Sequence, residues 1–283
     1  MAELIRDVHV MQQMADRCRA SGKRIGVVPT MGYLHEGHLS LIREAKKRAD
    51  VVITTVFVNP KQFGPSEDFS RYPRNLDGDV ALATSGGTDI IFAPEAHAVY
   101  PDGYLTTIDV AHLDSLQEGK SRPGHFRGVT TVVAKLINIT KPHVAVFGQK
   151  DAQQAVIIRR MMEDLNFDVE VVVAPIVREA DGLAMSSRNS YLTPDQRREA
   201  PVLHHALQLA GRMIKEGAIE SEAIINEMKQ VIDSGSSGSI DYISIADGRT
   251  LEEVPRCTVR PLLVSLAVRF GSTRLIDNVT ITS

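Results

Sequence analysis

The run Val51–Val58 (VVITTVFV) constrains the fold of this chain more than any other segment. It is rich in β-branched residues and lacks the polar alternation of a strand with one face in water. Such a run is typical of a strand buried on both faces, as in a parallel sheet covered by helices. Other short apolar runs have the same character: Lys23–Val28, Asp89–Ala93, His143–Phe147 and Asp168–Ala174.

Helical stretches lie between these runs, at Leu39–Ala49, Leu76–Thr84 and Ala152–Asp164. Strand, helix and strand at this spacing indicate βαβ units with right-handed crossovers. We therefore predict an α/β fold: a Rossmann-like doubly wound parallel sheet with a smaller α+β C-terminal domain.

The last hundred residues or so change character. Thr193 followed by Pro194 and Gln196 is a typical helix start, and Pro201 predicts a break near Ala200. Apolar stripes over 203–214 and 224–232 predict two helices. Strand-like runs follow at Asp241–Ile245, Leu262–Phe270 and Thr273–Asn278. We place the domain boundary near Ile176–Asp181, with domains over residues 1–177 and 178–283.

The composition excludes several classes of protein. The net charge is −3 and charged residues make up 24% of the chain, so no nucleic-acid or membrane-surface partner is expected. No apolar run approaches the roughly 20 residues of a membrane span, and the N-terminal segment lacks a signal-peptide core. Cys18 and Cys257 lie far apart, which argues for a reducing compartment. We expect a cytoplasmic protein.

Polar and glycine-rich segments follow the predicted strands. Ligands of an open parallel sheet bind beyond the carboxyl ends of its strands, where such segments gather. Because the predicted strands are parallel, these segments should meet at one edge of the sheet and form one composite site. The segments are PTMGYLHEGH (29–38), NPKQFGPSEDF (59–69), GQKD (148–151) and MSSRN (185–189).

The segment His35-Glu36-Gly37-His38 leads from a strand into a helix and has three interpretations. Its two histidines could bind a metal, although the zinc-protease spacing and cysteine companions are missing. They could also be part of an ordinary capping turn. The third interpretation is the HxGH phosphate-binding motif, which the preceding strand, Gly32 and Gly37 favour.

Further segments suit a nucleotide and a small acid. Lys150 could contact phosphate oxygens and Asp151 could cap a helix, but a solvated turn would look the same. Met185–Arg188 offers hydroxyls, amides and a guanidinium, or it is a polar linker. The amides of Asn59 and Gln62 could orient a polar molecule, as could Gln153 or Gln154. The compact basic loop Arg122–Gly128 suits a carboxylate or phosphates. Neither the P-loop pattern nor GxGxxG occurs.

Taken in order, these segments resemble the pantothenate synthetase (pantoate–β-alanine ligase) family of the HxGH nucleotidyltransferase superfamily. The resemblance rests on PTMGYLHEGH, FVNPKQF, RYPRNLDGD, RPGHFRGV, FGQKDAQQ and MSSRN, with YISIAD and RLIDN further on. It covers nearly the whole chain. One departure is Gln149, where the family usually has Glu, and this puts a carboxylate role at that position in doubt.

The resemblance implies a role for each matching position. His38, His35, Lys150 and Arg188 would be catalytic, and Gln62 would also lie near β-alanine. Pantoate would contact Gln62 and Gln154, with Asn59, Arg122 and His125 as further candidates. ATP would contact Thr30, Met31, Gly32, Tyr33, Leu34, His35, Glu36, Gly37, His38, Gly148, Gln149, Lys150, Asp151, Val177, Met185, Ser186, Ser187 and Arg188.

The resemblance also implies a reaction and its partners. ATP would activate (R)-pantoate as an adenylate, which β-alanine would convert to pantothenate with release of AMP and diphosphate. Mg²⁺ would bind through the ATP phosphates rather than through a protein cage, and the chain would act as a homodimer. Residues 1–177 would bind ATP and pantoate, and residues 178–283 would form a lid. Phe63–Tyr72 and Met185–Asn189 are candidate closing loops.

Two other functions fit the same segments. A nucleotidylyltransferase shares HxGH and the fold, but it would keep the nucleotide in its product. A non-catalytic nucleotide sensor would bind ATP without turnover. An aminoacyl-tRNA synthetase is disfavoured because the chain is short, slightly acidic and has no basic RNA-binding domain.

Overall fold

A computed structural model describes residues 2–65 and 67–282 of the chain. These residues form two compact units, each with its own core. The first is Met1–Gly148 with Ile157–Pro175, and the second is Gln149–Val156 with Ile176–Ser283. The second unit therefore takes in the short segment Gln149–Val156, which no change in composition indicates.

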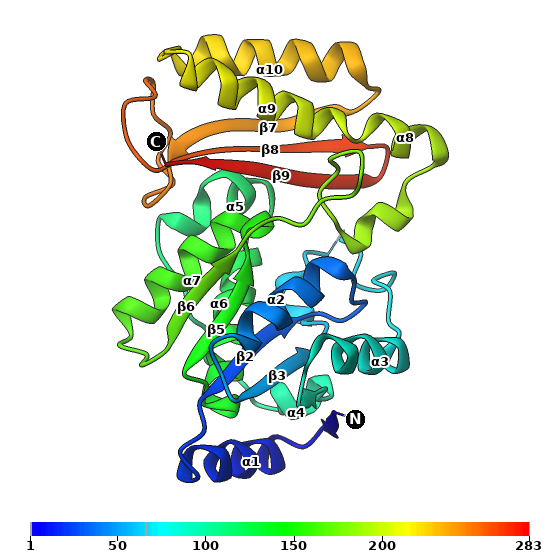
Figure 1. Ribbon diagram of the computed structural model, residues 1–283, viewed down its shortest axis with the longest axis vertical. Helices are drawn as coiled ribbons and strands as arrows, with labels where there is room; N and C mark the ends of the chain where they lie inside the picture. Colours follow the sequence, from blue (N-terminus) through cyan, green and yellow to red (C-terminus); the bar gives the residue numbers. More distant parts are fainter. Residues whose placement is uncertain (1, 66, 283) are drawn as a thin grey trace. The chain divides into compact units, whose positions relative to one another are not determined.

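The first unit is built on a six-stranded parallel sheet (Figure 1). Its order is β1-β4-β3-β2-β5-β6, so the chain steps outward from β2 in one direction and from β5 in the other. The point where the order reverses is where doubly wound sheets bind ligands. The predicted doubly wound fold is confirmed. The strands are β1 (Glu3–Ile5), β2 (Ile25–Thr30), β3 (Val51–Val56), β4 (Ile90–Phe92), β5 (Val144–Gly148) and β6 (Glu170–Ala174).

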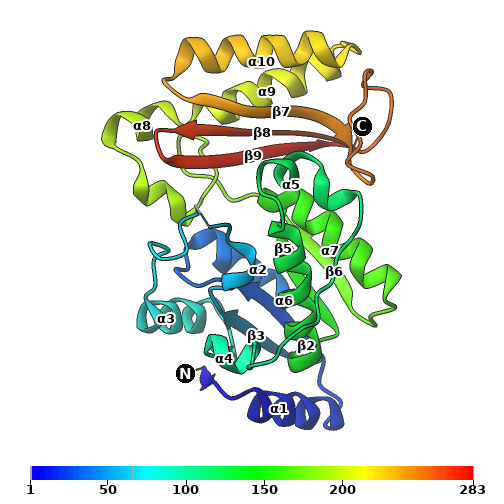
Figure 2. The ribbon, with the colours of Figure 1, turned by 180° about the vertical axis from the view of Figure 1, so that it is seen from behind.

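Helices cover both faces of this sheet. Helices α2 and α3 pack on one face, and α1, α6 and the C-terminal part of α7 pack on the other (Figures 1 and 2). The helices are α1 (Val8–Ala20), α2 (Glu36–Lys46), α3 (Leu76–Gly86), α4 (Ala96–Val99), α5 (Gln117–Ser121), α6 (His125–Thr140) and α7 (Ala152–Asp164). Short 3-10 turns are η1 (Pro60–Gln62), η2 (Leu113–Ser115) and η3 (Gln149–Asp151).

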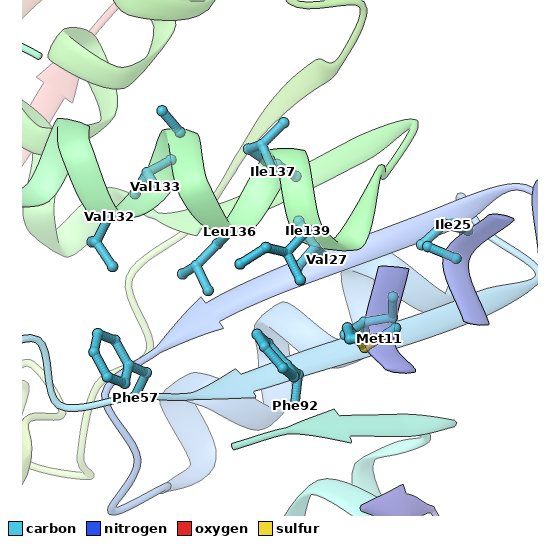
Figure 3. Close-up of a cluster of buried hydrophobic side chains, with 14 of the residues drawn as sticks. Met11, Ile25, Val27, Phe57, Phe92, Val132, Val133, Leu136, Ile137 and Ile139 are labelled. Carbon is cyan, nitrogen blue, oxygen red and sulfur yellow. The ribbon is translucent and has the colours of Figure 1, made fainter. Parts of the chain in front are cut away.

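Helix α6 corrects one expectation from the sequence. Residues 122–128 were expected to form a compact loop, but His125–Gly128 are the first turn of this 16-residue helix. Gly124, with φ of +83°, turns the chain into it. Most of α6 is buried. Its run Val129–Val133 consists of β-branched residues, which favour strands and so obscure the helix in the sequence. Figure 3 shows Val132 and Leu136 of α6 above the same face of the sheet as Phe92.

The second unit packs helices on one antiparallel sheet of order β7-β8-β9. Its elements are η4 (Ser187–Tyr191), α8 (Pro194–Glu199), α9 (Val202–Lys215), α10 (Ser221–Gly235), β7 (Ser239–Asp247), β8 (Leu262–Phe270) and β9 (Thr273–Ile281). The predicted helix start at Thr193 is confirmed, since its side chain and that of Gln196 cap each other's backbone. The break around Pro201 is confirmed too, because it separates α8 from α9.

Among the described residues, no helix combines the length and the apolar character that crossing a bilayer requires.

We predict that Met11→Ala destabilises the first unit strongly, because Met11 of α1 is fully buried in the core of Figure 3. The free energy of unfolding should fall by about 2–5 kcal/mol. Val10, the neighbouring residue, is 44% exposed and gives a matched control. Val10→Ala should stay within about 0.5 kcal/mol of the parent in urea unfolding. Equal losses in the two variants would contradict the packing described for α1.

Candidate active site

The turn between β2 and α2 is held in an unusual backbone conformation. Gly32 and Tyr33 both have positive φ, at 80° and 51°. A Cβ atom on Gly32 would lie 2.8 Å from Asp79 Oδ2 and 2.9 Å from Val56 Cγ1, so no other residue fits there without displacement. Thr30, the last residue of β2, accepts the Gly32 N–H through Oγ1 at 3.1 Å.

The buried carboxylate of Asp79 fixes this turn. It reaches from α3 and accepts the N–H of Tyr33 at 3.0 Å and that of Leu34 at 2.7 Å. Burial raises the pKa of Asp79, and the two backbone hydrogen bonds offset part of that rise. Asp79 belongs to the segment RYPRNLDGD, but nothing in its spacing identifies the turn it holds, some 45 residues away in sequence.

The two histidines of HEGH cap helix α2 and each other. His35 is the N-cap residue, and its Nδ1 accepts the Gly37 N–H at 3.1 Å. His38 Nδ1 accepts the His35 N–H at 3.2 Å, and the two ring centroids are 4.1 Å apart. A backbone N–H can only donate, so both Nδ1 atoms must be unprotonated acceptors. Each ring therefore carries its proton on Nε2, which makes Nε2 a hydrogen-bond donor.

The capping interpretation of HEGH is thus confirmed, and it is compatible with a phosphate-binding role. The helix begins with its positive dipole end at this turn. Glu36 forms an ion pair with Arg43 on the same helix. The side chain between the histidines is therefore neutralised within α2.

Asn59 is predicted from the sequence to bind a small acid. In the structure, both the oxygen and the nitrogen of its carboxamide are hydrogen-bonded within the protein. Its Oδ1 accepts the Lys61 N–H at 3.2 Å and the Tyr100 hydroxyl at 2.9 Å. Its Nδ2 donates to the carbonyl of Gly128 at 3.0 Å and to Gln62 Oε1 at 3.0 Å. The geometry makes Asn59 a support for Gln62, and a direct contact with pantoate stays a prediction.

These contacts fix which way Gln62 faces. The Lys61 N–H and the Gly128 carbonyl leave only one orientation for the Asn59 amide. Gln62 therefore turns Oε1 toward Asn59, and its Nε2 lies 3.1 Å from Met31 Sδ in the β2–α2 turn. The acid-binding candidate thus presents an N–H donor beside the candidate nucleotide turn.

Arg122 and His125 form a network under Gln62. Arg122 pairs with Glu67 through two hydrogen bonds of 2.7 Å and donates to His125 Nε2 at 3.0 Å. His125 Nδ1 then donates to the Gln62 carbonyl at 2.8 Å. Burial, with the Arg122 charge added, lowers the pKa of His125 to about 4. Both residues are thus engaged as supports, and their contact with pantoate stays a prediction.

Gly128 lets helix α6 approach η1 closely. A Cβ atom there would lie 2.3 Å from the Lys61 carbonyl oxygen and 2.7 Å from Gln62 Cα. This close contact explains a glycine in RPGHFRGV. Tyr100 and Gly128 support the site, but sequence reasoning gave neither of them a role.

The second unit carries the other candidate residues. Gln149, Lys150 and Asp151 form the 3-10 turn η3 directly after Gly148, the last residue of β5. Lys150 Nζ lies 3.9 Å from Asp151 Oδ1. Gln153 is buried and Gln154 is partly exposed, so Gln154 is the more accessible of the two glutamines.

A hairpin in the second unit leads to the MSSRN segment. The Val177 carbonyl accepts the Met185 N–H at 3.0 Å, so it is engaged within the hairpin. Ser186 caps η4 by accepting the Arg188 N–H at 3.2 Å. Asn189 Nδ2 donates to Glu179 at 2.8 Å, and Arg197 of α8 forms an ion pair with the same carboxylate. The segment is thus fastened at its far end while Ser187 and Arg188 are only partly buried.

The candidate residues therefore form two local groups. The first unit brings together the β2–α2 turn and the residues around Gln62 through the Gln62–Met31 contact. The second unit holds η3 and the hairpin with MSSRN. Over residues 2–65 and 67–282, no three His, Cys, Asp or Glu side chains are grouped so as to hold a metal ion.

A doubly wound parallel sheet with a histidine-capped helix after β2 defines the class of Rossmann-like α/β proteins that carry the HxGH turn. Comparison with known proteins identifies the family within this class. The model of the pantoate–β-alanine ligase family matches residues 3–280. A pantothenate synthetase from Moorella thermoacetica is 52% identical over 279 residues, which are 99% of this chain and 98% of that protein.

Solved structures agree. Pantothenate synthetase from Thermus thermophilus superposes with a TM-score of 0.94 at 42% identity, covering 99% of this chain and 100% of that one. Pantoate–β-alanine ligase from Francisella tularensis, solved with β-γ ATP and β-alanine, gives 0.81 at 33% identity, with 99% and 98% covered. The chain belongs to the pantoate–β-alanine ligase family. It is accordingly a ligase that joins pantoate to β-alanine.

We predict that His125 makes the stability depend on pH. Its pKa is lowered from 6.5 to about 4, so between these values the unfolded chain binds a proton that the folded chain does not. Stability contributed by the neutral ring is complete above pH 6.5 and falls as the pH drops toward 4. Burial raises the pKa of Glu67, but hydrogen bonds and charges, chiefly those of Arg122, outweigh it and lower the pKa, so the Glu67 contribution is lost mainly below pH 4.5. The interval from pH 7 to pH 5 therefore reports mainly on His125.

His125→Gln keeps a donor for the Gln62 carbonyl but removes the titration. From pH 7 to pH 5 the parent should lose roughly 2 kcal/mol more unfolding free energy than the variant. Urea titrations at the two pH values measure this difference. The same pH dependence in both proteins would show that His125 is not buried as a neutral ring.

Proposed function

We propose that the chain makes pantothenate in two steps through a pantoyl-adenylate. A carboxylate oxygen of (R)-pantoate bonds to the α-phosphorus of ATP, the bond to the bridging oxygen breaks, and diphosphate leaves. The amine of β-alanine then bonds to the acyl carbon and loses a proton, the acyl C–O bond breaks, and AMP leaves with the bridging oxygen. The family supports this reaction, as does the Francisella relative solved with β-γ ATP and β-alanine.

One observation in this chain carries the proposal: the contact between Gln62 Nε2 and Met31 Sδ. It links an oriented amide donor, suited to a carboxylate, with the turn that ends in the histidine-capped helix. Gln62 is the proposed ligand of pantoate and lies near β-alanine in the second step. Gln154 is a further proposed pantoate ligand.

In the first step, the negatively charged carboxylate of pantoate approaches the negatively charged phosphates of ATP. A carboxylate is already a nucleophile at neutral pH, so the step needs electrostatic stabilisation rather than a base. His35 and His38 donate through Nε2, because their Nδ1 atoms accept backbone hydrogen bonds. Neutral donors at a helix N-terminus suit the α-phosphate and its transition state. Thr30 to Leu34 and Gly37 supply close backbone contacts to ATP.

Cations of the second unit act on the remaining phosphate charge. Lys150 and Arg188 contact phosphate oxygens. The further proposed ATP contacts here are Gly148, Gln149, Asp151 and Ser186–Ser187. Mg²⁺ enters with ATP as part of the substrate, held by phosphate oxygens and water. Val177 contacts adenine through its backbone.

The mixed anhydride must be protected from water before β-alanine attacks. We assign this protection to Phe63–Tyr72 and Met185–Asn189, together with residues 178–283 as a lid. Ser66, within the first of these loops, lies outside the described residues. The same proposal includes a homodimer in the cytoplasm.

We predict that Lys150→Ala and His38→Ala each slow adenylate formation about 10²–10³-fold, because each removes a donor that acts on the transition state. The assay supplies ATP, Mg²⁺ and pantoate with or without β-alanine, and follows diphosphate, AMP and the amide. AMP and the amide should accumulate only when pantoate and β-alanine are both present. Near-parental rates in either variant would remove that residue from the site, and a product that retains the nucleotide would indicate a nucleotidylyltransferase.

We predict that Gln62→Ala weakens pantoate use more than ATP binding, because Gln62 presents an Nε2–H donor to the acid. Loss of one hydrogen bond to a charged group should raise the KM for pantoate roughly tenfold or more. Calorimetric titration of ATP provides the comparison and should give a nearly unchanged Kd. Weakened ATP binding with an unchanged KM for pantoate would contradict this assignment.

A further inference from the structure

Asn278 of β9 is buried and hydrogen-bonds the backbone of η3, the turn that carries Lys150. Its Nδ2 donates to the carbonyls of Gln149 at 3.0 Å and Lys150 at 2.9 Å. Its Oδ1 accepts from Gln149 Nε2 at 3.0 Å. Carbonyl oxygens can only accept, so the orientation of both side-chain amides is fixed. Asn278 is 3% exposed, and its carboxamide is engaged on both sides.

Gln149 adds a second attachment to the same strand. Its Nε2 also donates to Thr280 Oγ1 at 2.9 Å, two residues further along β9. Both N–H groups of the Gln149 amide are thus used as donors. A carboxylate at this position would have no hydrogen to offer Asn278. The turn η3 is therefore held to β9 through side-chain donors and backbone acceptors together.

The preceding residue of β9 holds the other candidate segment. Asp277 is 2% exposed and pairs with Arg178 through hydrogen bonds of 2.6 and 3.0 Å. Arg178 belongs to the hairpin that leads to Met185–Arg188. Two consecutive residues of β9 thus support the turn bearing Lys150 and the hairpin that leads to Arg188.

We propose that Asn278 is a positioning residue for the adenylation step. It touches no substrate and acts by fixing the backbone of η3, from which Lys150 extends. This inference rests on the proposed function of Lys150. The backbone of η3 sets the point from which the Lys150 side chain extends, and so limits where its ammonium group can lie. An error of about 1 Å in such a group can cost on the order of 10²-fold in rate.

The test is a double-mutant cycle on the full-length protein, using Asn278→Ala, Lys150→Ala and the combined variant. Pantoate-dependent diphosphate release is measured in single turnovers. Asn278→Ala should slow this step about 10–100-fold and leave the KM for pantoate within about twofold, because Gln62 is untouched. In the Lys150→Ala background, Asn278→Ala should have less than about a threefold further effect, since it acts through Lys150.

Asn278→Asp is the second variant, and it keeps the shape while losing both donors to the turn. It should slow the same step at least as much as Asn278→Ala, and it replaces that variant in the cycle if Asn278→Ala does not fold. Val264→Ala, in the fully buried core of neighbouring β8, is the control for general destabilisation. It should lower Tm while leaving the single-turnover rate near that of the parent.

A parental rate in the Asn278 variants would overturn the proposal. So would an equal slowing in the presence and absence of Lys150, because that pattern belongs to a residue with a general structural role. A parental rate for Lys150→Ala alone would instead remove the proposed function of Lys150. The two failures are therefore distinguishable.

Discussion

The candidate site depends on a carboxylate buried beneath a strained turn. Gly32 and Tyr33 adopt positive φ, and Asp79 accepts the N–H groups of Tyr33 and Leu34. Without this acceptor, two backbone donors in a tight turn would lack their partners, which costs roughly 1–3 kcal/mol for each one buried. The direction in which α2 leaves the sheet, and with it the place of both histidines, follows from this turn.

A backbone N–H can only donate and a backbone carbonyl can only accept a hydrogen bond. Such groups determine which atoms of several side chains are donors and which are acceptors. The N–H groups of Gly37 and His35 make both histidines Nε2–H donors, without reference to any ligand. The Lys61 N–H and the Gly128 carbonyl do the same for Asn59 and then for Gln62. The fold itself therefore fixes the hydrogen-bonding character of these candidate side chains, which is what electrostatic preorganisation requires.

Much of the fold could be predicted from the sequence because it follows from local patterns. The apolar run at 51–58 gave β3, the bounds of β8 match the predicted run, and Thr193 marks a helix start. Helix α6 was missed because its first half contains the β-branched run Val129–Val133, which favours a strand. The roles of Asp79, Asn278 and Glu67 were out of reach, because each depends on a partner between 45 and 129 residues away.

Charge is distributed in a way that suits the proposed chemistry. In the first unit, Arg122 is paired with Glu67, and burial holds His125 neutral near pH 7, so neither of these neighbours of Gln62 adds an unpaired cation. A strong cation beside the small acid would bind its carboxylate and lower its reactivity toward phosphorus. Under the proposed function, the neutral amide of Gln62 orients the carboxylate and leaves it nucleophilic. The cations proposed for the phosphates, Lys150 and Arg188, belong to segments fastened to β9 through Asn278 and Asp277. The orientation of the acid and the neutralisation of phosphate charge are therefore assigned to separate structural supports, and each can be altered experimentally without altering the other.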